Sequence, residues 1–208
     1  MQSWAPVDVP RLEGSGPPEA VEVLEKASVP MVTVPESFDR DGILEKIRVV
    51  GETLGVADKA AKLAESVGAE IDAAQALTAG IEERRSVLFV LSLQGGRVLA
   101  SGTGTAADGI IALAGGVNAV TGYSGYKQLS DEAAILAKPD IILMMDRGGG
   151  HGIAEAELFA HPAIAPTPAG QAKRLIRMDG AYLLGFGPRT AAAARELATG
   201  IYGDALAN

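Results

Sequence analysis

Residues 57–85 decide how the chain is organised, and they read ADKAAKLAESVGAEIDAAQALTAGIEERR. Almost every one of them is a helix former, the segment holds no proline, and Gly68 and Gly80 are its weak points. Because an α-helix rises about 1.5 Å per residue, the pattern predicts one helix of about 40 Å from Ala57 to about Arg85. This helix is longer than those that commonly connect neighbouring strands, so we expect it to link two α/β parts of the chain.

A complete α/β domain is predicted from Ser86 to the end of the chain. Val87–Leu93 and Val98–Ser101 flank the turn Gln94–Arg97, and their period-two pattern predicts a hairpin. Beyond it, helical and strand patterns alternate, which predicts an α/β fold with a partly parallel sheet. A Gly-rich loop and a helix are expected over 102–114, and further helices over 130–137, 155–159 and 190–202. The expected strands are 141–145, 174–178 and 181–184.

Residues 1–56 read as the remnant of a first α/β lobe. No apolar periodicity precedes Pro18, after which a helix is predicted over 18–27 and a short buried strand over 29–34. A second helix is predicted with Ser37 as its N-cap, and it ends at Gly55. One strand cannot form the sheet that these helices would cover, so this part either packs on the second domain or lacks upstream chain, and we favour upstream chain that completes the lobe. A third alternative is a homodimer, in which a second copy pairs with its edge. The predicted division is 1–56, 57–85 and 86–208.

The composition narrows the classes of function. The chain has 208 residues, 48% of them apolar, and 26 acidic against 18 basic side chains give a formal net charge of −8. Such a surface repels polyanions, which argues against a nucleic-acid partner. Cysteine is absent, which excludes disulfides, thiolate metal sites and cysteine catalysis. No apolar run reaches the roughly 18 residues of a membrane span, and residues 1–10 lack a secretory pattern, so we expect neither membrane insertion nor an export signal in the sequence as given.

The loop Gly102–Ala107 has the spacing G-x-G-x-x-A between a strand and a helix, which is typical of a dinucleotide site. The preceding strand, however, is the second arm of a hairpin rather than the first strand of a βαβ unit. We therefore prefer a tight structural loop in which Thr103 or Thr105 caps the helix and Asp108 lies in its first turn. A nucleotide-dependent enzyme that uses this loop stays as the alternative from a different class.

Four side chains are candidates for ligand binding because they lie in loops next to strands, where open α/β sheets bind their ligands. His151 follows the strand 141–145 and is suited to be a single axial iron ligand, or it is a solvated loop histidine. Arg147, in the same loop, can form a bidentate pair with a ligand carboxylate. Tyr123 and Tyr126 either line a pocket or cover the edge of the core. His161 is interpreted as a residue at a helix end rather than a ligand.

Two further observations concern reaction chemistry and partners. The sequence contains no G-x-S-x-G, and Gly122–Gly125 has the wrong spacing for a nucleophile elbow, so hydrolase chemistry has no support. Ser130 is the predicted N-cap of the next helix, with Asp131 and Glu132 in its first turn. An exposed acid at Glu132 is also able to dock a cationic partner surface.

Several runs, spread in order along the chain, resemble the haem-binding periplasmic proteins of bacterial haem ABC importers, which are class III periplasmic binding proteins. The runs are 100–108 (ASGTGTAAD), 125–133 (GYKQLSDEA), 138–143 (KPDIIL), 167–170 (TPAG), 178–180 (MDG) and 184–189 (LGFGPR). The resemblance extends from Glu13 onward, with residues 14–18 matching a loop late in the family's first lobe.

The resemblance implies two α/β lobes joined by one long helix, with haem between the lobes, and a periplasmic binding protein rather than an enzyme. Tyr126, Arg147 and His151 become the candidates for covering haem in the second lobe, with His151 as the candidate for the iron. Glu132 matches the acid by which this lobe engages arginines of the ABC permease. The family's tyrosine ligand of the first lobe falls upstream of Met1. A siderophore or cobalamin binder of the same fold is the alternative within the class.

Overall fold

The computed structural model describes residues 8–94, 96–146 and 153–206. The chain divides into two compact units that meet between Ala69 and Glu70. In the described part of the chain, no helix is both long enough and apolar enough to cross a membrane. The α/β class predicted from the sequence is confirmed in each unit.

The first unit begins with a β-α-β segment made of β1 (Val9–Leu12), α1 (Pro18–Lys26) and β2 (Met31–Val34). The two strands pair in parallel, with Val9 opposite Met31 and Leu12 opposite Val34. The expected helix and the strand after it are confirmed, but β1 was not predicted. Its sequence, Val-Pro-Arg-Leu, contains a proline and an arginine and leaves three of four residues exposed, so it has no hydrophobic alternation.

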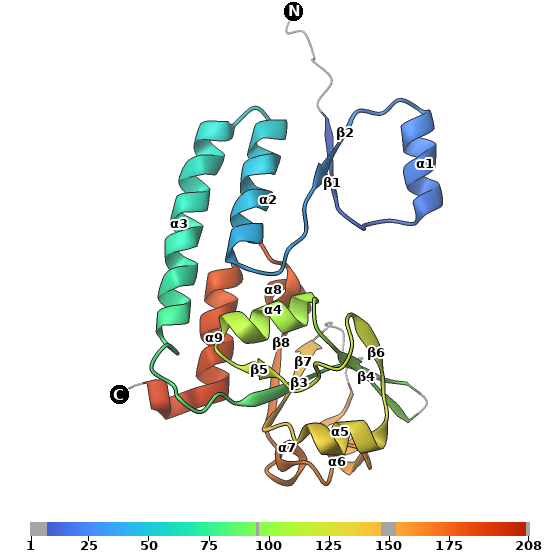
Figure 1. The fold of residues 1–208 in the computed structure, drawn as a ribbon, viewed down its shortest axis with the longest axis vertical. Coiled ribbons are helices and arrows are strands. Elements are labelled where there is room, and N and C mark those ends of the chain that lie inside the picture. Colours follow the sequence, from blue (N-terminus) through green and yellow to red (C-terminus); the bar gives the residue numbers. More distant parts are fainter. Residues whose placement is uncertain (1–7, 95, 147–152, 207–208) are drawn as a thin grey trace, which may run out of the picture. The chain divides into compact units, whose positions relative to one another are not determined.

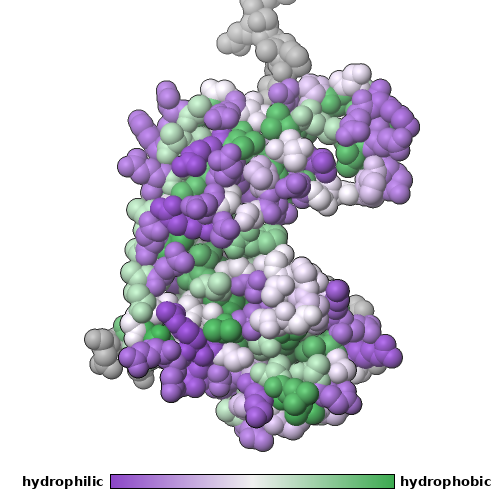
Figure 2. Space-filling view, in the orientation of Figure 1, coloured by the Kyte–Doolittle hydropathy of each residue, from purple (hydrophilic) through white to green (hydrophobic). Residues whose placement is uncertain are grey.

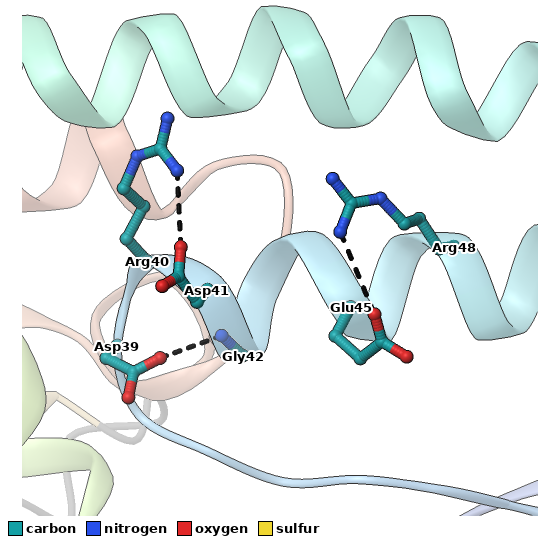
Figure 3. A network of polar contacts seen from close by, with 6 residues as sticks. All are labelled: Asp39, Arg40, Asp41, Gly42, Glu45 and Arg48. Carbon is teal, nitrogen blue, oxygen red and sulfur yellow. Dashed lines mark hydrogen bonds and ion pairs between the residues drawn. The ribbon is translucent and has the colours of Figure 1, made fainter.

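Helix α2 (Arg40–Thr53) begins at an aspartate rather than at the serine predicted from the sequence. Oδ1 of Asp39 accepts a hydrogen bond from the Gly42 N–H at 2.7 Å, and the hydroxyl of Ser37 donates to the other carboxylate oxygen at 2.8 Å. Both hydrogen bonds stabilise the charged carboxylate and lower the pKa of Asp39, and the bond from Gly42 has the larger effect. Asp39 is therefore the N-cap, and Ser37 holds its carboxylate in place through a hydrogen bond. Figure 3 shows this cap and two exposed ion pairs on the same helix.

Helix α3 (Ala57–Ala76) ends nine residues before the end that the sequence predicted at Arg85. After Ala76 the backbone N–H groups bond three residues back, and the hydroxyl of Thr78 donates to the Gln75 carbonyl at 3.3 Å. The guanidinium of Arg84 donates to the Gly115 carbonyl at 3.0 Å. Residues 77–85 have high helix propensity, but these contacts end the helix at Ala76. The segment instead connects α3 to the first strand of the second unit.

The second unit is built on a six-stranded mixed sheet in the order β6-β4-β3-β7-β8, with β5 paired to β3. Strands β3, β7 and β8 run parallel, and β4 is antiparallel to both of its neighbours. The predicted hairpin is confirmed as β3 and β4. The strands are β3 (Ser86–Gln94), β4 (Arg97–Ser101), β5 (Val117–Asn118), β6 (Tyr126–Leu129), β7 (Ile141–Asp146) and β8 (Leu175–Asp179).

Helices cover both faces of this sheet, with α4, α8 and α9 on one face and α5, α6 and α7 on the other (Figure 1). Their bounds are α4 (Ala106–Leu113), α5 (Asp131–Ala137), α6 (Glu155–Ala160), α7 (Pro168–Gln171), α8 (Gly180–Leu184) and α9 (Thr190–Tyr202), followed by a 3-10 turn at Gly203–Leu206. The strand predicted over 181–184 is wrong, because this segment is α8. Asp179 caps it by accepting from the Tyr182 N–H at 2.8 Å, so the chain turns into a helix directly after β8.

The core lies on both sides of β3 and β7. In β7 the residues Ile141, Ile142, Leu143 and Met144 are all buried, as expected for a central strand that helices cover on both faces. Ile142 and Met144 pack with Leu158 of α6 and with residues of α5 and α7. Burial of each such side chain contributes about 1.5–3 kcal/mol, so this strand is the rigid base from which the adjoining loops start.

Candidate functional site

The loop between β4 and α4 is a capped structural loop, as preferred from its sequence. The hydroxyl of Thr105 accepts from the Asp108 N–H at 3.0 Å, and Oδ2 of Asp108 accepts from the Gly104 N–H at 2.9 Å. A phosphate at this loop would compete with the Asp108 carboxylate for the Gly104 donor and would meet its negative charge. The geometry therefore favours a structural role over a dinucleotide site.

The same loop holds the tyrosine segment 123–126 in place. Backbone N–H groups of Gly102 and Thr103 donate to the carbonyls of Gly125 and Tyr123 at 2.8 and 2.9 Å, and Gly125 donates back to Thr103 at 3.0 Å. A Cβ added at Gly102 would lie 2.2 Å from the Tyr123 carbonyl oxygen and 2.5 Å from its ring. Glycine is thus required for the backbone and ring to approach this closely.

Buried Asn118 connects this loop to α4, and no local sequence pattern predicted its role. Its amide group donates to the Gly102 carbonyl at 3.1 Å and to Oδ1 of Asp108 at 2.9 Å. Its oxygen accepts from the Val120 N–H at 3.0 Å. One side chain therefore satisfies three groups from separate parts of the unit.

Tyr126 is the first residue of β6, where it pairs with Ser101, and 38% of it is exposed. Its ring packs edge-on against buried Phe89, with the ring centroids 6.2 Å apart. Burial disfavours the phenolate and raises the pKa of Tyr126, although hydrogen bonding with Thr105 and Ala107 acts in the opposite direction. The side chain thus covers the edge of the core and also presents a neutral phenol and part of an aromatic ring to the surface.

Tyr123 is engaged within the protein. Its phenol lies 3.2 Å from the Ala100 carbonyl and 3.3 Å from the Lys127 carbonyl, and it donates to these acceptors. The ammonium of Lys127 lies 5.5 Å from the centre of its ring. Burial raises the pKa of Tyr123, so the phenol stays protonated and serves as a donor to the backbone.

Arg147 and His151 lie outside the described residues, but both ends of their loop are described. The loop leaves from Asp146 at the end of β7, which is paired with Asp179 of β8. It returns at Ile153, whose carbonyl accepts a hydrogen bond from the guanidinium of Arg177. The described residues on either side of 147–152 are therefore held by strand pairing at Asp146 and by the Arg177 side chain at Ile153.

His161 follows α6 as its C-cap and is buried, which confirms the interpretation as a helix-end residue. Its Nδ1 accepts from the Ala163 N–H at 3.2 Å, so the proton lies on Nε2, which donates to the Gly96 carbonyl at 3.0 Å. Both ring nitrogens are engaged. Within residues 8–94, 96–146 and 153–206, no three His, Asp or Glu side chains are grouped so that they could hold a metal ion.

Glu132 is exposed in the first turn of α5, whose start matches the sequence prediction. The hydroxyl of Ser130 caps this helix by accepting from the Ala133 N–H at 3.2 Å. Glu132 forms no ion pair with any residue that the structure describes. Its carboxylate is consequently available to a partner.

Comparison with known proteins gives consistent matches along the chain. Residues 11–182 match the model of the family described as periplasmic binding protein. The structure of the periplasmic heme-binding protein RhuT from Roseiflexus sp. RS-1 is 37% identical, with a TM-score of 0.87 over 96% of this chain and 76% of that one. For the periplasmic heme-binding protein HutB of Vibrio cholerae the identity is 31% and the TM-score 0.80, over 94% of this chain and 77% of that one.

A further relative comes from Bacillus subtilis (strain 168). It is YvrC, described as an uncharacterized ABC transporter substrate-binding lipoprotein, and it is 24% identical over 188 residues. The match covers 89% of this chain but 58% of YvrC, so the chain spans less than two thirds of that relative's length.

Proposed function

Because the chain belongs to the periplasmic binding protein family, we propose that it captures haem for a bacterial ABC importer and delivers it to the permease. The observation that carries the proposal is the 37% identity and the TM-score of 0.87 shared with a protein described as periplasmic and heme-binding. The match extends over 96% of this chain and 76% of that one. The family consists of transporter substrate-binding proteins, and the proposed role requires binding and release without a catalytic step.

The chemistry of haem matches the residue types in these loops. Haem is a flat apolar ring with two carboxylates and an iron ion. Tyr126 contributes an aromatic edge and a hydroxyl to the ring, Arg147 forms a fork with a propionate, and His151 binds the iron through a neutral imidazole nitrogen. Arg147 and His151 follow the carboxyl end of β7, where open α/β sheets bind their ligands, and this position in the sequence supports the proposed roles.

The proposed setting is the periplasm, where the loaded protein meets the permease. The description of YvrC as an ABC transporter substrate-binding lipoprotein supports this setting. Glu132 is the proposed docking acid of the second unit, because it is exposed and forms no ion pair with the described residues. A cationic surface of the permease is the partner that this charge fits.

An absorbance titration of the full chain with haemin tests the cargo. We expect a saturable Soret shift near one equivalent, weakened about tenfold by His151→Ala and less by Arg147→Gln. We expect Tyr126→Phe to weaken binding as well. Tyr182→Phe, on α8, is its control, because it removes a tyrosine hydroxyl from another part of the unit. Failure to bind haemin, with saturable binding of cobalamin or a ferric siderophore, would reject haem as the cargo and favour the alternatives of the same fold.

A further inference from the structure

The outward face of α5 carries two exposed aliphatic side chains next to the docking acid. Ile135 and Leu136 follow Glu132 by three and four residues, so all three lie on one side of the helix. Leu136 is 76% exposed and Ile135 38%, whereas Ala134 is fully buried against the core. Hydrophobic surface is visible over the region of α5, with hydrophilic side chains around it (Figure 2). An aliphatic pair this exposed gains free energy when a partner covers it.

The charges along α5 run in one direction. Asp131 and Glu132 lie in its first turn, and exposed Lys138 follows its last residue as the C-cap. A partner that covers Leu136 must therefore present a cation toward the start of the helix and keep cations away from its end. This order of charges fixes both the chemistry and the orientation of the partner.

An open depression of about 530 Å³ lies beside the first turn and is bounded by Gly96, Arg97, Gln128 and Glu132. Arg97 and Gln128 both line the depression, and the guanidinium of Arg97 donates to the side-chain oxygen of Gln128 at 2.9 Å. A long cationic side chain of a partner has room there to reach Glu132. The depression thus accommodates the cation, and the aliphatic pair offers the adjoining apolar contact.

We propose that Ile135 and Leu136 form, with Glu132, a mixed acidic and apolar docking face, whose partner is a permease surface with an arginine or lysine flanked by apolar side chains. The inference rests on the proposed transport function and adds the apolar half of the contact. Glu132 supplies charge attraction, which is sensitive to salt, and Leu136 supplies burial, which is not. The two contributions are therefore separable by experiment.

The test measures binding of the full chain to the haem ABC permease of the same organism in nanodiscs, at several salt concentrations. We expect Leu136→Ser to raise the Kd about tenfold and Ile135→Ser about threefold, without changing the dependence of the Kd on salt. Glu132→Gln raises the Kd at low salt and flattens that dependence. Leu77→Ser is the matched control, since Leu77 is 44% exposed in the same unit and lies outside α5.

Circular dichroism confirms that each variant is folded, and a haemin titration runs in parallel. The proposal is overturned if Leu136→Ser and Ile135→Ser bind the permease with the same Kd as the wild type. The proposed transport function is retained in that case if the chain still binds haemin. A wild-type chain that binds neither haemin nor the permease overturns both. An equal loss of docking in Leu77→Ser also contradicts a face confined to α5.

Discussion

Gly102 is a position where the contacts of one residue determine the shape of a candidate loop. We expect Gly102→Ala to destabilise the fold by about 1–3 kcal/mol, because the added Cβ would meet the Tyr123 backbone and ring at 2.2–2.5 Å. Urea unfolding followed by circular dichroism measures this change. Gly122→Ala, in the loop between β5 and β6 that contains Tyr123, is the control, since a Cβ there has no atom within 4 Å. Equal stability of the two variants would contradict the close approach.

Asn118 leads to a second prediction, because its side chain makes three hydrogen bonds in a buried position. Asn118→Ala should lower the free energy of unfolding by about 2–3 kcal/mol, as each bond contributes roughly 1 kcal/mol and the partners are left unsatisfied. Asn118→Asp should destabilise at least as much at pH 7, since it places a carboxylate against Asp108. Thermal unfolding at pH 7 compares both variants. A loss below about 0.5 kcal/mol in both would show that water replaces these bonds.

The roles of single residues were predictable where they depend on neighbours in the chain. Thr105 and Ser130 cap helices that begin with the next residue, so residue type and spacing were sufficient. Asn118 and His161 depend on partners that the fold brings together, and the Gly96 carbonyl is 65 residues away from His161. No local pattern encodes such contacts. For Tyr126 the sequence left open whether it lines a pocket or covers the core, and its contact with Phe89 supplies the second role.

At the level of elements, the cap of α2 predicts a pH dependence. The pKa of Asp39 is lowered in the folded chain from 3.8, chiefly by the Gly42 hydrogen bond, so its carboxylate stabilises the fold above about pH 4. That contribution is lost as the pH falls through the folded pKa. Asp39→Ala should therefore destabilise by about 1 kcal/mol at pH 7 and by less at pH 2.5. Asp39→Ser, which caps without titrating, should keep most of the stability at both pH values.

Unfolding curves at pH 7 and pH 2.5 measure this difference. If the wild type and Asp39→Ala differ equally at both pH values, the stabilising group is not the carboxylate. Ser37→Ala provides a second comparison, since it removes the weaker of the two named hydrogen bonds and should lower the stability less than Asp39→Ala.

Elements with strong periodicity were predicted well, and those set by long-range contacts were not. Helix α9 has the predicted bounds, Thr190–Tyr202, because its apolar residues, among them Ala194, Leu197 and Ile201, repeat at helical spacing. Helix α3 was predicted too long, because propensity alone does not register the turn at Thr78. Helix α8 was mistaken for a strand, since four apolar residues fit either structure and the cap from Asp179 decided between them.

For the whole molecule, the α/β class and the family were predictable from the sequence, since the runs that carry the resemblance are also those that shape the loops. Gly102, Thr105 and Ser130 all lie in those runs, and each has a structural reason for its type. The two ends of the 147–152 loop are fixed by pairing between β7 and β8 and by Arg177. This pairing depends on segments about 30 residues apart, so it was not visible in the local pattern.

The two units differ in how deeply their elements are buried, which predicts how their amides exchange with solvent. None of the nine residues of α1 is buried, whereas four consecutive residues of β7 are. Amides of α1 should therefore exchange through local opening, at least about a hundredfold faster than those of β7, which exchange only when the second unit unfolds. Hydrogen–deuterium exchange with mass spectrometry measures both segments in one sample. Similar protection in α1 and β7 would mean that another surface covers α1 in solution. If that surface belongs to a second copy of the chain, dilution lowers the protection of the α1 amides; if it belongs to the same chain, dilution leaves their protection unchanged.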